Sequence, residues 1–203
     1  MKSGRIHPLW MMSVGVGAVL LLLLVLPGPA TGASVQGEPL SLTPQVYLPL
    51  IWKSPTCALS PQEAEVARYM IEHSEQQRPS LTCHPILARV ARERAEDMAR
   101  RGYFSHVTPE GYGPNYLVRQ AGYVLPSYYD QAPDANNIES IAAGYPSASA
   151  VWNGWMNSSG HRTHLLGLHP FFAEQVEYGV GYAYLPGSPY GYYWVVITAK
   201  PGP

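Results

Sequence analysis

The chain has 203 residues, of which 46% are hydrophobic and 13% charged, and its formal net charge is -1. That length suits one domain with added segments, the hydrophobic share excludes a wholly disordered chain, and the balanced charge excludes a basic surface for nucleic acid. Tyr outnumbers Phe by 15 to 3. Because Tyr combines an apolar ring with a polar tip, this surplus indicates wet surfaces that stack and hydrogen-bond.

Residues 1–33 have the layout of a secretory signal peptide. Two positive charges, Lys2 and Arg5, precede an apolar run from Trp10 to Leu26, and small residues suited to cleavage end the segment at Ala33. The alternative is an uncleaved membrane anchor, although the run is slightly short for a span of about 20 residues. We therefore predict a secreted or extracellular protein, with cell-envelope association possible, that meets the membrane only through this segment before cleavage.

Residues 34–56 are predicted to form a Pro-rich tether. Four prolines, at positions 39, 44, 49 and 55, restrict the backbone and oppose a helix. The apolar string from Val46 to Trp52 has two interpretations. It docks on the folded domain, which we favour, or it contacts a partner or a membrane.

A folded domain is predicted over residues 57–203, and its helices come first. The sequence from Ser60 to Glu63 is a capping box with Pro at the first helical position, which predicts a helix ending near Glu75. An apolar stripe predicts a second helix from about residue 84 to 102, with its charged residues, Arg94 included, on the solvated face. Shorter helices are predicted at 115–120 and 148–156.

The strands are predicted late in the chain. Residues 177–185 and 192–199 are rich in Tyr and Val and flank a turn-forming loop, which indicates an antiparallel hairpin. A third short strand is predicted at 137–142. Helices first and strands last are typical of an α+β domain.

The two cysteines, Cys57 and Cys83, bracket the first helix. Export would let a disulfide between them persist, and closing that loop contributes roughly 3–4 kcal/mol in the chain-entropy model. The alternative is a catalytic thiol at Cys83 beside His84. We predict the disulfide, because pairing is the commoner state of exported cysteines.

Four sequence segments together resemble one family. The chain is similar to bacterial secreted members of the CAP superfamily, which share the SCP-like or pathogenesis-related-1-like domain, from about Ser60 to Pro201. This resemblance implies a three-layer α-β-α sandwich with a small antiparallel sheet. The matching segments are Phe104-Ser105-His106, Ile138-Glu139-Ser140-Ile141-Ala142, Trp155 to Arg162, and Glu177 to Tyr182.

The resemblance also implies a cleft lined by two His and two Glu, which in some members is associated with a divalent metal such as zinc. His106 and Glu139 match two of these positions. His161 and Glu177 are the motif-matched candidates for the others, and His106 and His161 are the expected metal ligands. The rival positions are His169 and Glu174, because the link before the last strand is longer than usual. Ser140 replaces the family's common Asn.

Two classes of function remain open. We favour a binding or interaction module, expected to be a monomer, whose cleft holds a lipid, peptide or cell-envelope glycan. The alternative is a metal-assisted or His/Glu acid-base hydrolase of the peptidase kind. Neither the His-Glu-x-x-His run of zincins nor the Gly-x-Ser-x-Gly elbow of α/β-hydrolases is present. His161 and His164, three residues apart, are predicted to lie on exposed surface rather than to form a second metal site.

Overall fold

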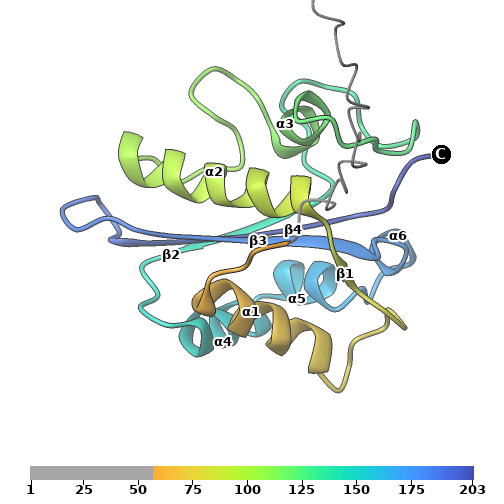
Figure 1. Cartoon of the computed structure of the whole chain (residues 1–203), viewed down its shortest axis with the longest axis horizontal. Helices are drawn as coiled ribbons and strands as arrows, with labels where there is room; N and C mark the ends of the chain where they lie inside the picture. Colours follow the sequence, from red (N-terminus) through yellow and green to blue (C-terminus); the bar gives the residue numbers. More distant parts are fainter. Residues whose placement is uncertain (1–56) are drawn as a thin grey trace, which may run out of the picture. The chain divides into compact units, whose positions relative to one another are not determined.

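The computed structural model describes residues 57–203, and the predicted signal peptide and Pro-rich tether lie outside the described residues. A sheet is covered by helices on both faces (Figure 1). Its strands are β1 (Thr82–Cys83), β2 (Glu139–Ala143), β3 (Glu177–Tyr184) and β4 (Tyr192–Ala199). The helices are α1 (Pro61–Glu72), α2 (Pro85–Arg101), α3 (Pro114–Gln120), α4 (Ala148–Met156), α5 (Ser159–Leu165) and α6 (Pro170–Ala173).

The helices and the sheet form three layers, so the predicted α-β-α sandwich is confirmed. Figure 1 shows α2 and α3 on one face of the sheet and α1, α4 and α5 on the other. The strand order is β1-β3-β4-β2, so β2 is an edge strand. The pairs β3–β4 and β2–β4 are antiparallel, and only the two-residue β1 pairs in parallel, with β3. The predicted antiparallel hairpin is therefore present, with β4 at the centre of a larger sheet.

Alternation along the strands divides the core into two clusters. Side chains of successive strand residues point to opposite faces of a sheet. On β4, Val195 and Ile197 join the cluster under α2, and Trp194 and Val196 join the cluster over α1 and α4. The same alternation on β2 sends neighbouring residues into different layers, which determines how the site described below is built.

The ends of the first two helices follow the expected local chemistry. Ser60 accepts a hydrogen bond from the Glu63 backbone, and the Glu63 carboxylate accepts one from the Ser60 N–H at 2.7 Å, so the predicted capping box is present. The helix ends at Glu72, three residues before the predicted end. Gly102 ends α2 with a φ of 68°, the left-handed conformation that glycine adopts without strain.

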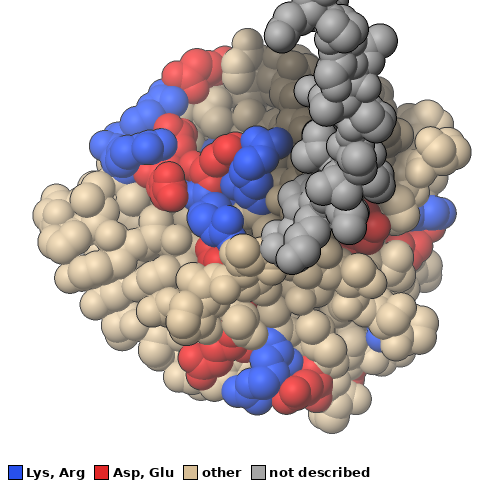
Figure 2. Space-filling model, in the orientation of Figure 1, with Lys and Arg blue, Asp and Glu red and all other residues tan. Residues whose placement is uncertain are grey.

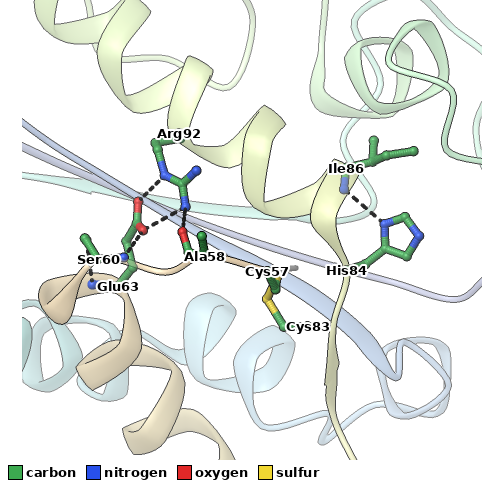
Figure 3. Close-up of a disulfide and its surroundings, with 8 residues drawn as sticks. All are labelled: Cys57, Ala58, Ser60, Glu63, Cys83, His84, Ile86 and Arg92. Atoms are coloured by element: carbon green, nitrogen blue, oxygen red, sulfur yellow. Dashed lines mark hydrogen bonds and ion pairs between the residues drawn. A yellow bond between two sulfur atoms is a disulfide. The ribbon is translucent and has the colours of Figure 1, made fainter. Parts of the chain in front are cut away.

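The predicted disulfide between Cys57 and Cys83 is present (Figure 3), and the alternative of a free thiol at Cys83 is wrong. The bridge ties the first described residue to β1, directly before α2. Close by, the buried Glu63 accepts hydrogen bonds from Arg92 at 2.8 and 3.0 Å, which joins α1 to α2. The entry of the domain is thus held by a covalent bond and by an ion pair.

Charged side chains are unevenly distributed over the described surface. In Figure 2 they gather over α2 and at the lower edge of the molecule, whereas the hairpin end on the left shows none. The sequence from Tyr178 to Ala199 contains no Asp, Glu, Lys or Arg. Within residues 57–203, no helix combines the length and the apolar character that crossing a membrane requires.

Candidate functional site

A pocket of about 260 Å³ lies at the Glu139 end of β2. Because the side chains of Glu139 and Ser140 point to opposite faces of the sheet, the first faces α2 and the second faces α5. The loop after α2 brings His106 to the same place, and α5 brings His161. The lining residues are His106, Asn136, Asn137, Ile138, Glu139, Ser140, Ser158, Gly160, His161, His164 and Phe172.

Glu139 and Arg94 form a buried ion pair at the floor of this pocket. The side chains are 0% and 3% exposed, and Arg94 Nε donates to Glu139 Oε2 at 3.1 Å. Burial by itself lowers the pKa of Arg94, but the charge and hydrogen bond of Glu139 outweigh it, and the pKa is raised. Arg94 therefore stays charged, and its hydrogen bond holds the carboxylate in one orientation.

The ion pair belongs to a longer chain of hydrogen bonds. Arg94 also donates to the Ser105 carbonyl at 2.7 Å and to the Tyr103 hydroxyl at 2.7 Å. That hydroxyl donates to Asp97 at 2.6 Å, and burial, followed by the bond to Asp97, raises the pKa of Tyr103 to about 12. The guanidinium thus positions the loop that carries the cleft histidine.

His106 is oriented by Glu139. Its Nδ1 lies 3.0 Å from Glu139 Oε1 and 3.0 Å from the amide nitrogen of Asn136. The Asn136 oxygen accepts from the Glu139 N–H at 2.9 Å, so its NH₂ group must face the ring, and two donors cannot share one hydrogen bond. The carboxylate is the stronger acceptor, so in the neutral ring the proton belongs on Nδ1 and Nε2 carries none.

His161 approaches from the opposite wall of the pocket. Its Nδ1 lies 2.9 Å from the Ser158 hydroxyl, at the start of α5. Burial, and secondarily the charge of His106, lowers the pKa of His161. The ring is therefore neutral at neutral pH, which is the state of histidine that binds metals. Within the described residues, no hydrogen bond is made by Nε2 of either histidine.

His164 is buried, and the prediction that it is exposed is wrong. It lies under the pocket between Ser140 on β2 and Thr198 on β4, at 2.7 Å from each hydroxyl. Burial, and next the charge of Arg78, lowers the pKa of His164 to about 3. The burial of His164 could not be predicted from its spacing to His161, because the residues that bury it come from other elements.

Arg78, in the loop between α1 and β1, binds backbone carbonyl groups of α5 and α6. Its guanidinium donates to the carbonyls of His164, Leu165 and Phe172 at 2.7 to 3.0 Å. Burial lowers its pKa to about 10, so it remains charged at neutral pH. Because its Nη2 also lies 3.5 Å from the Thr198 hydroxyl on β4, Arg78 links the helix that carries His161 to that strand.

Glu177 is not brought to this pocket. It lies at the start of β3, with β4 between it and β2, and accepts a hydrogen bond from the Tyr123 hydroxyl at 2.7 Å. It lines a different cavity, of about 240 Å³, together with His84. Burial, and next the bond to Glu177, raises the pKa of Tyr123.

The rival positions also lie elsewhere. His169 caps the start of α6, where its Nδ1 accepts from the Phe171 N–H at 3.2 Å. Glu174 pairs with Lys200 at 2.9 Å and accepts a hydrogen bond from Tyr128. Of the six residues singled out in the sequence, the pocket unites His106, Glu139 and His161.

Sequence reasoning missed Arg94, which was predicted to lie on the solvated face of its helix. The spacing of Leu87, Ala91, Arg94 and Met98 is four, three and four residues, which places Arg94 on the buried row. A charged residue within an apolar stripe is costly to bury unpaired, and it therefore indicates a buried partner. That signal could have predicted the ion pair with Glu139.

The pocket does not contain a ready-made cage for a metal. Among residues 57–203, no three His, Cys, Asp or Glu side chains form a metal-binding group. Glu139 already pairs with Arg94 and His106, which leaves it less available to a metal than a free carboxylate. The groups that remain available are the Nε2 atoms of the two histidines.

Sequence comparison agrees with this architecture. The family described as CAP, the Cysteine-rich secretory protein family, matches residues 66–198, which is more than half of the chain. The chain therefore belongs to this family. The match includes all of the segments that form the pocket.

The individual proteins that the chain resembles share a third or less of its residues over the matched parts. The uncharacterized protein YkwD of Bacillus subtilis (strain 168) is 32% identical over 111 residues, which are 55% of this chain and 38% of that protein. An extracellular protein containing an SCP domain from Bacillus anthracis str. Ames has the same fold, with a TM-score of 0.53 and 22% identity over 71% of this chain and 45% of that one. An outer surface protein of Borrelia burgdorferi has a TM-score of 0.49 and 21% identity, covering 68% of this chain and 88% of that one. The chain thus spans less than half the length of the two Bacillus proteins.

Proposed function

We propose that the chain is an extracellular binding module whose cleft holds a divalent metal between His106 and His161 and takes a ligand beside it. One observation carries the proposal. Both imidazoles line the same pocket, and the Nδ1 of each is already held by the protein, through Glu139 and Ser158. Each ring therefore has its Nε2 left for a metal.

The donor set fits an open site for a metal such as zinc. Neutral imidazole nitrogen is a common zinc ligand, and a carboxylate behind the histidine raises its basicity and fixes its orientation. Two protein ligands leave coordination positions for water or for an exogenous ligand. A bound divalent ion would polarise a ligand oxygen there. The set does not suit a closed structural zinc site, which takes four protein ligands.

The second candidate function is acid-base hydrolysis. The bond between Glu139 and His106 favours it, because a carboxylate on Nδ1 leaves Nε2 as a base. Arg94 holds that carboxylate against Nδ1, where it would stabilise a protonated imidazole. Hydrolysis predicts turnover of peptides or esters that is lost in His106→Ala, whereas a binding module predicts none.

Metal titration tests the main proposal. We expect one zinc per chain by calorimetry of chelator-treated protein, and at least about tenfold weaker binding in His106→Ala and in His161→Ala. His169→Asn is the matched control, because Asn preserves the helix cap at a histidine remote from the cleft. Unchanged zinc affinity in His161→Ala, with a native circular dichroism spectrum, would contradict the proposal.

Export is part of the same proposal. It is supported by the layout of residues 1–33, and the similar Bacillus anthracis protein is described as extracellular. We expect the intact mass of protein recovered from culture medium to correspond to a chain that starts at Ser34. Protein found only in the membrane fraction, with a mass that includes residues 1–33, would indicate the retained anchor instead.

A further inference from the structure

The outer edge of β2 presents unpaired backbone groups next to the candidate site. Thr198 N donates to the Ile138 carbonyl and Gly144 N donates to the Tyr192 carbonyl, both at 2.9 Å. In an antiparallel ladder such directly bonded pairs recur at every second residue. Even-numbered residues of β2 therefore bond to β4, and the backbone groups of Glu139, Ile141 and Ala143 point away from it.

Some of these outward groups are satisfied by side chains. Asn136 accepts from the Glu139 N–H and donates to the Glu139 carbonyl, at 2.9 and 3.2 Å. Trp155 Nε1 donates to the Ile141 carbonyl at 3.2 Å. Within residues 57–203, the Ile141 N–H and both the N–H and the carbonyl of Ala143 have no protein partner. Such an edge is a template for another strand.

The partly unpaired edge lies along a groove beside the cleft. This groove, of about 300 Å³, is lined by residues 141–143 on one side and by Phe104, Tyr145 and Trp155. Phe104 and Tyr145 are 40% and 36% exposed. Ser158 and His161 line both this groove and the pocket at Glu139, so the two are adjacent. None of the groove residues is Asp, Glu, Lys or Arg.

We propose that an extended peptide binds in this groove as an additional strand beside β2, with its backbone on Ile141 and Ala143. Outward groups of a strand repeat every two residues, about 6.8 Å apart, which matches the repeat of an extended peptide. Neither an acyl chain nor a sugar ring offers this alternation of donors and acceptors. The aromatic walls take uncharged side chains. The peptide continues past Ser158 to His161.

The inference rests on the proposed function, because it names the ligand class of the same cleft. It places the next peptide residues at the two histidine Nε2 atoms, where a bound metal would meet a peptide carbonyl oxygen. The backbone edge selects an extended conformation, and the uncharged groove selects against charged side chains. Recognition of the backbone accounts for a site built on the unpaired groups of a strand edge rather than on charged side chains.

The first experiment uses the wild-type protein and a defined peptide pool. N-acetylated hexapeptide amides composed of Ala, Val, Thr and Ser are titrated to about 1 mM while backbone amide resonances are followed by NMR. We expect the amides of Ile141 and Ala143 to shift. The best peptide is then N-methylated at alternate residues in two complementary sets. One set should bind at least about tenfold more weakly, because its methyl groups remove a hydrogen bond and block approach, and the other should bind as before.

Two protein variants complete the test. Ala143→Pro removes the outward N–H at an edge position where Pro is tolerated, and Ala143→Ser retains it. We expect peptide affinity at least about tenfold lower in the first and within about twofold of wild type in the second. Zinc affinity should be unchanged in both.

Three outcomes would overturn the inference: no pool peptide shifts the two amides, both methylated sets bind equally, or neutral oligosaccharides or lipid micelles shift these amides while peptides do not. If the wild-type protein still binds zinc in any of these cases, the proposed function stands although the peptide inference fails. The zinc affinity of His161→Ala tests only the metal site and gives no information about the peptide.

Discussion

At the scale of single residues, the hydrogen bonds under the cleft assign the protons of His164. Gln175 donates through its NH₂ group to the Asn137 carbonyl at 2.8 Å, so its oxygen accepts from Thr198 at 2.6 Å. Having given its only proton, Thr198 must accept from Nε2 of His164. Nδ1 then accepts from Ser140 at 2.7 Å. The ring is thus neutral with each nitrogen satisfied, and a second proton would have to displace the Ser140 bond.

This neutral state predicts a dependence of stability on pH. The folded pKa of His164, about 3, lies below the value of about 6.5 that it has when unfolded. Between these pH values the unfolded chain binds more protons than the folded one. The contribution of neutral His164 to the free energy of unfolding is therefore complete above about pH 6.5 and decreases as the pH is lowered toward 3. Urea unfolding from pH 7 to 4.5 should show a slope about 1.4 kcal/mol per pH unit shallower in His164→Asn than in wild type.

His169→Asn is the control for this measurement, since that residue lies at the exposed start of α6. We expect it to retain the wild-type slope. Equal slopes in His164→Asn and wild type would show that His164 does not titrate with unfolding in this range.

At the scale of elements, the contact between α2 and β3 depends on the absence of side chains. A Cβ on Gly179 would lie 2.2 Å from the backbone of Leu87 and Ala88, and one on Gly181 would lie 2.2 Å from the backbone of Ala91. The helix therefore rests directly on the strand. Because Arg94 follows on the same helix, this close packing also sets the depth at which the guanidinium reaches Glu139.

Alanine substitutions test the contact. Gly179→Ala and Gly181→Ala should each lower the free energy of unfolding by about 3 kcal/mol, since the helix must move away from the sheet. Gly160→Ala is the control: its new Cβ meets nothing within 4 Å, and in helix α5 alanine is favoured over glycine by about 1 kcal/mol. Urea midpoints measure all three. A Gly179→Ala protein as stable as Gly160→Ala would contradict the direct contact.

At the scale of the molecule, one sheet joins two apolar clusters. The cluster under α2 includes Leu87 and Ile197, and the opposite cluster includes Val151, Trp155 and Trp194. Since β4 contributes alternate residues to both, neither cluster is complete without it. The described part of the chain is thus expected to unfold as one cooperative unit.

A substitution in one layer, read by a probe in the other, tests this cooperativity. The three Trp residues of the described chain, at 152, 155 and 194, all belong to the cluster opposite α2. We expect Leu87→Ala, in the α2 layer, to lower the free energy of unfolding measured by Trp fluorescence by about 2–5 kcal/mol in a single transition. Circular dichroism should give the same midpoint. Two separate transitions would show that the layers unfold independently.

Much of the fold could be predicted from local patterns. The capping box at Ser60, the apolar stripe of α2 and the alternation in the hairpin are local signals, and each of these elements is present. Strand β1 and helices α5 and α6 were not predicted. A two-residue strand and a four-residue helix are too short to show a period, and β1 forms only because Glu177 and Tyr178 lie beside it.

The sequence alone indicated the family, because short motifs in a fixed order carry the resemblance. The resemblance in turn implied the α-β-α architecture and the cleft segments with His106, Glu139 and His161, and the predicted export of the chain favoured the disulfide. Only the tertiary structure decided which residues meet. It turned Arg94 and His164 inward, held Glu177 on Tyr123, and left one edge of β2 open. These outcomes depend on partners more than 20 residues away, and the burial that selects such partners arises only when the layers pack.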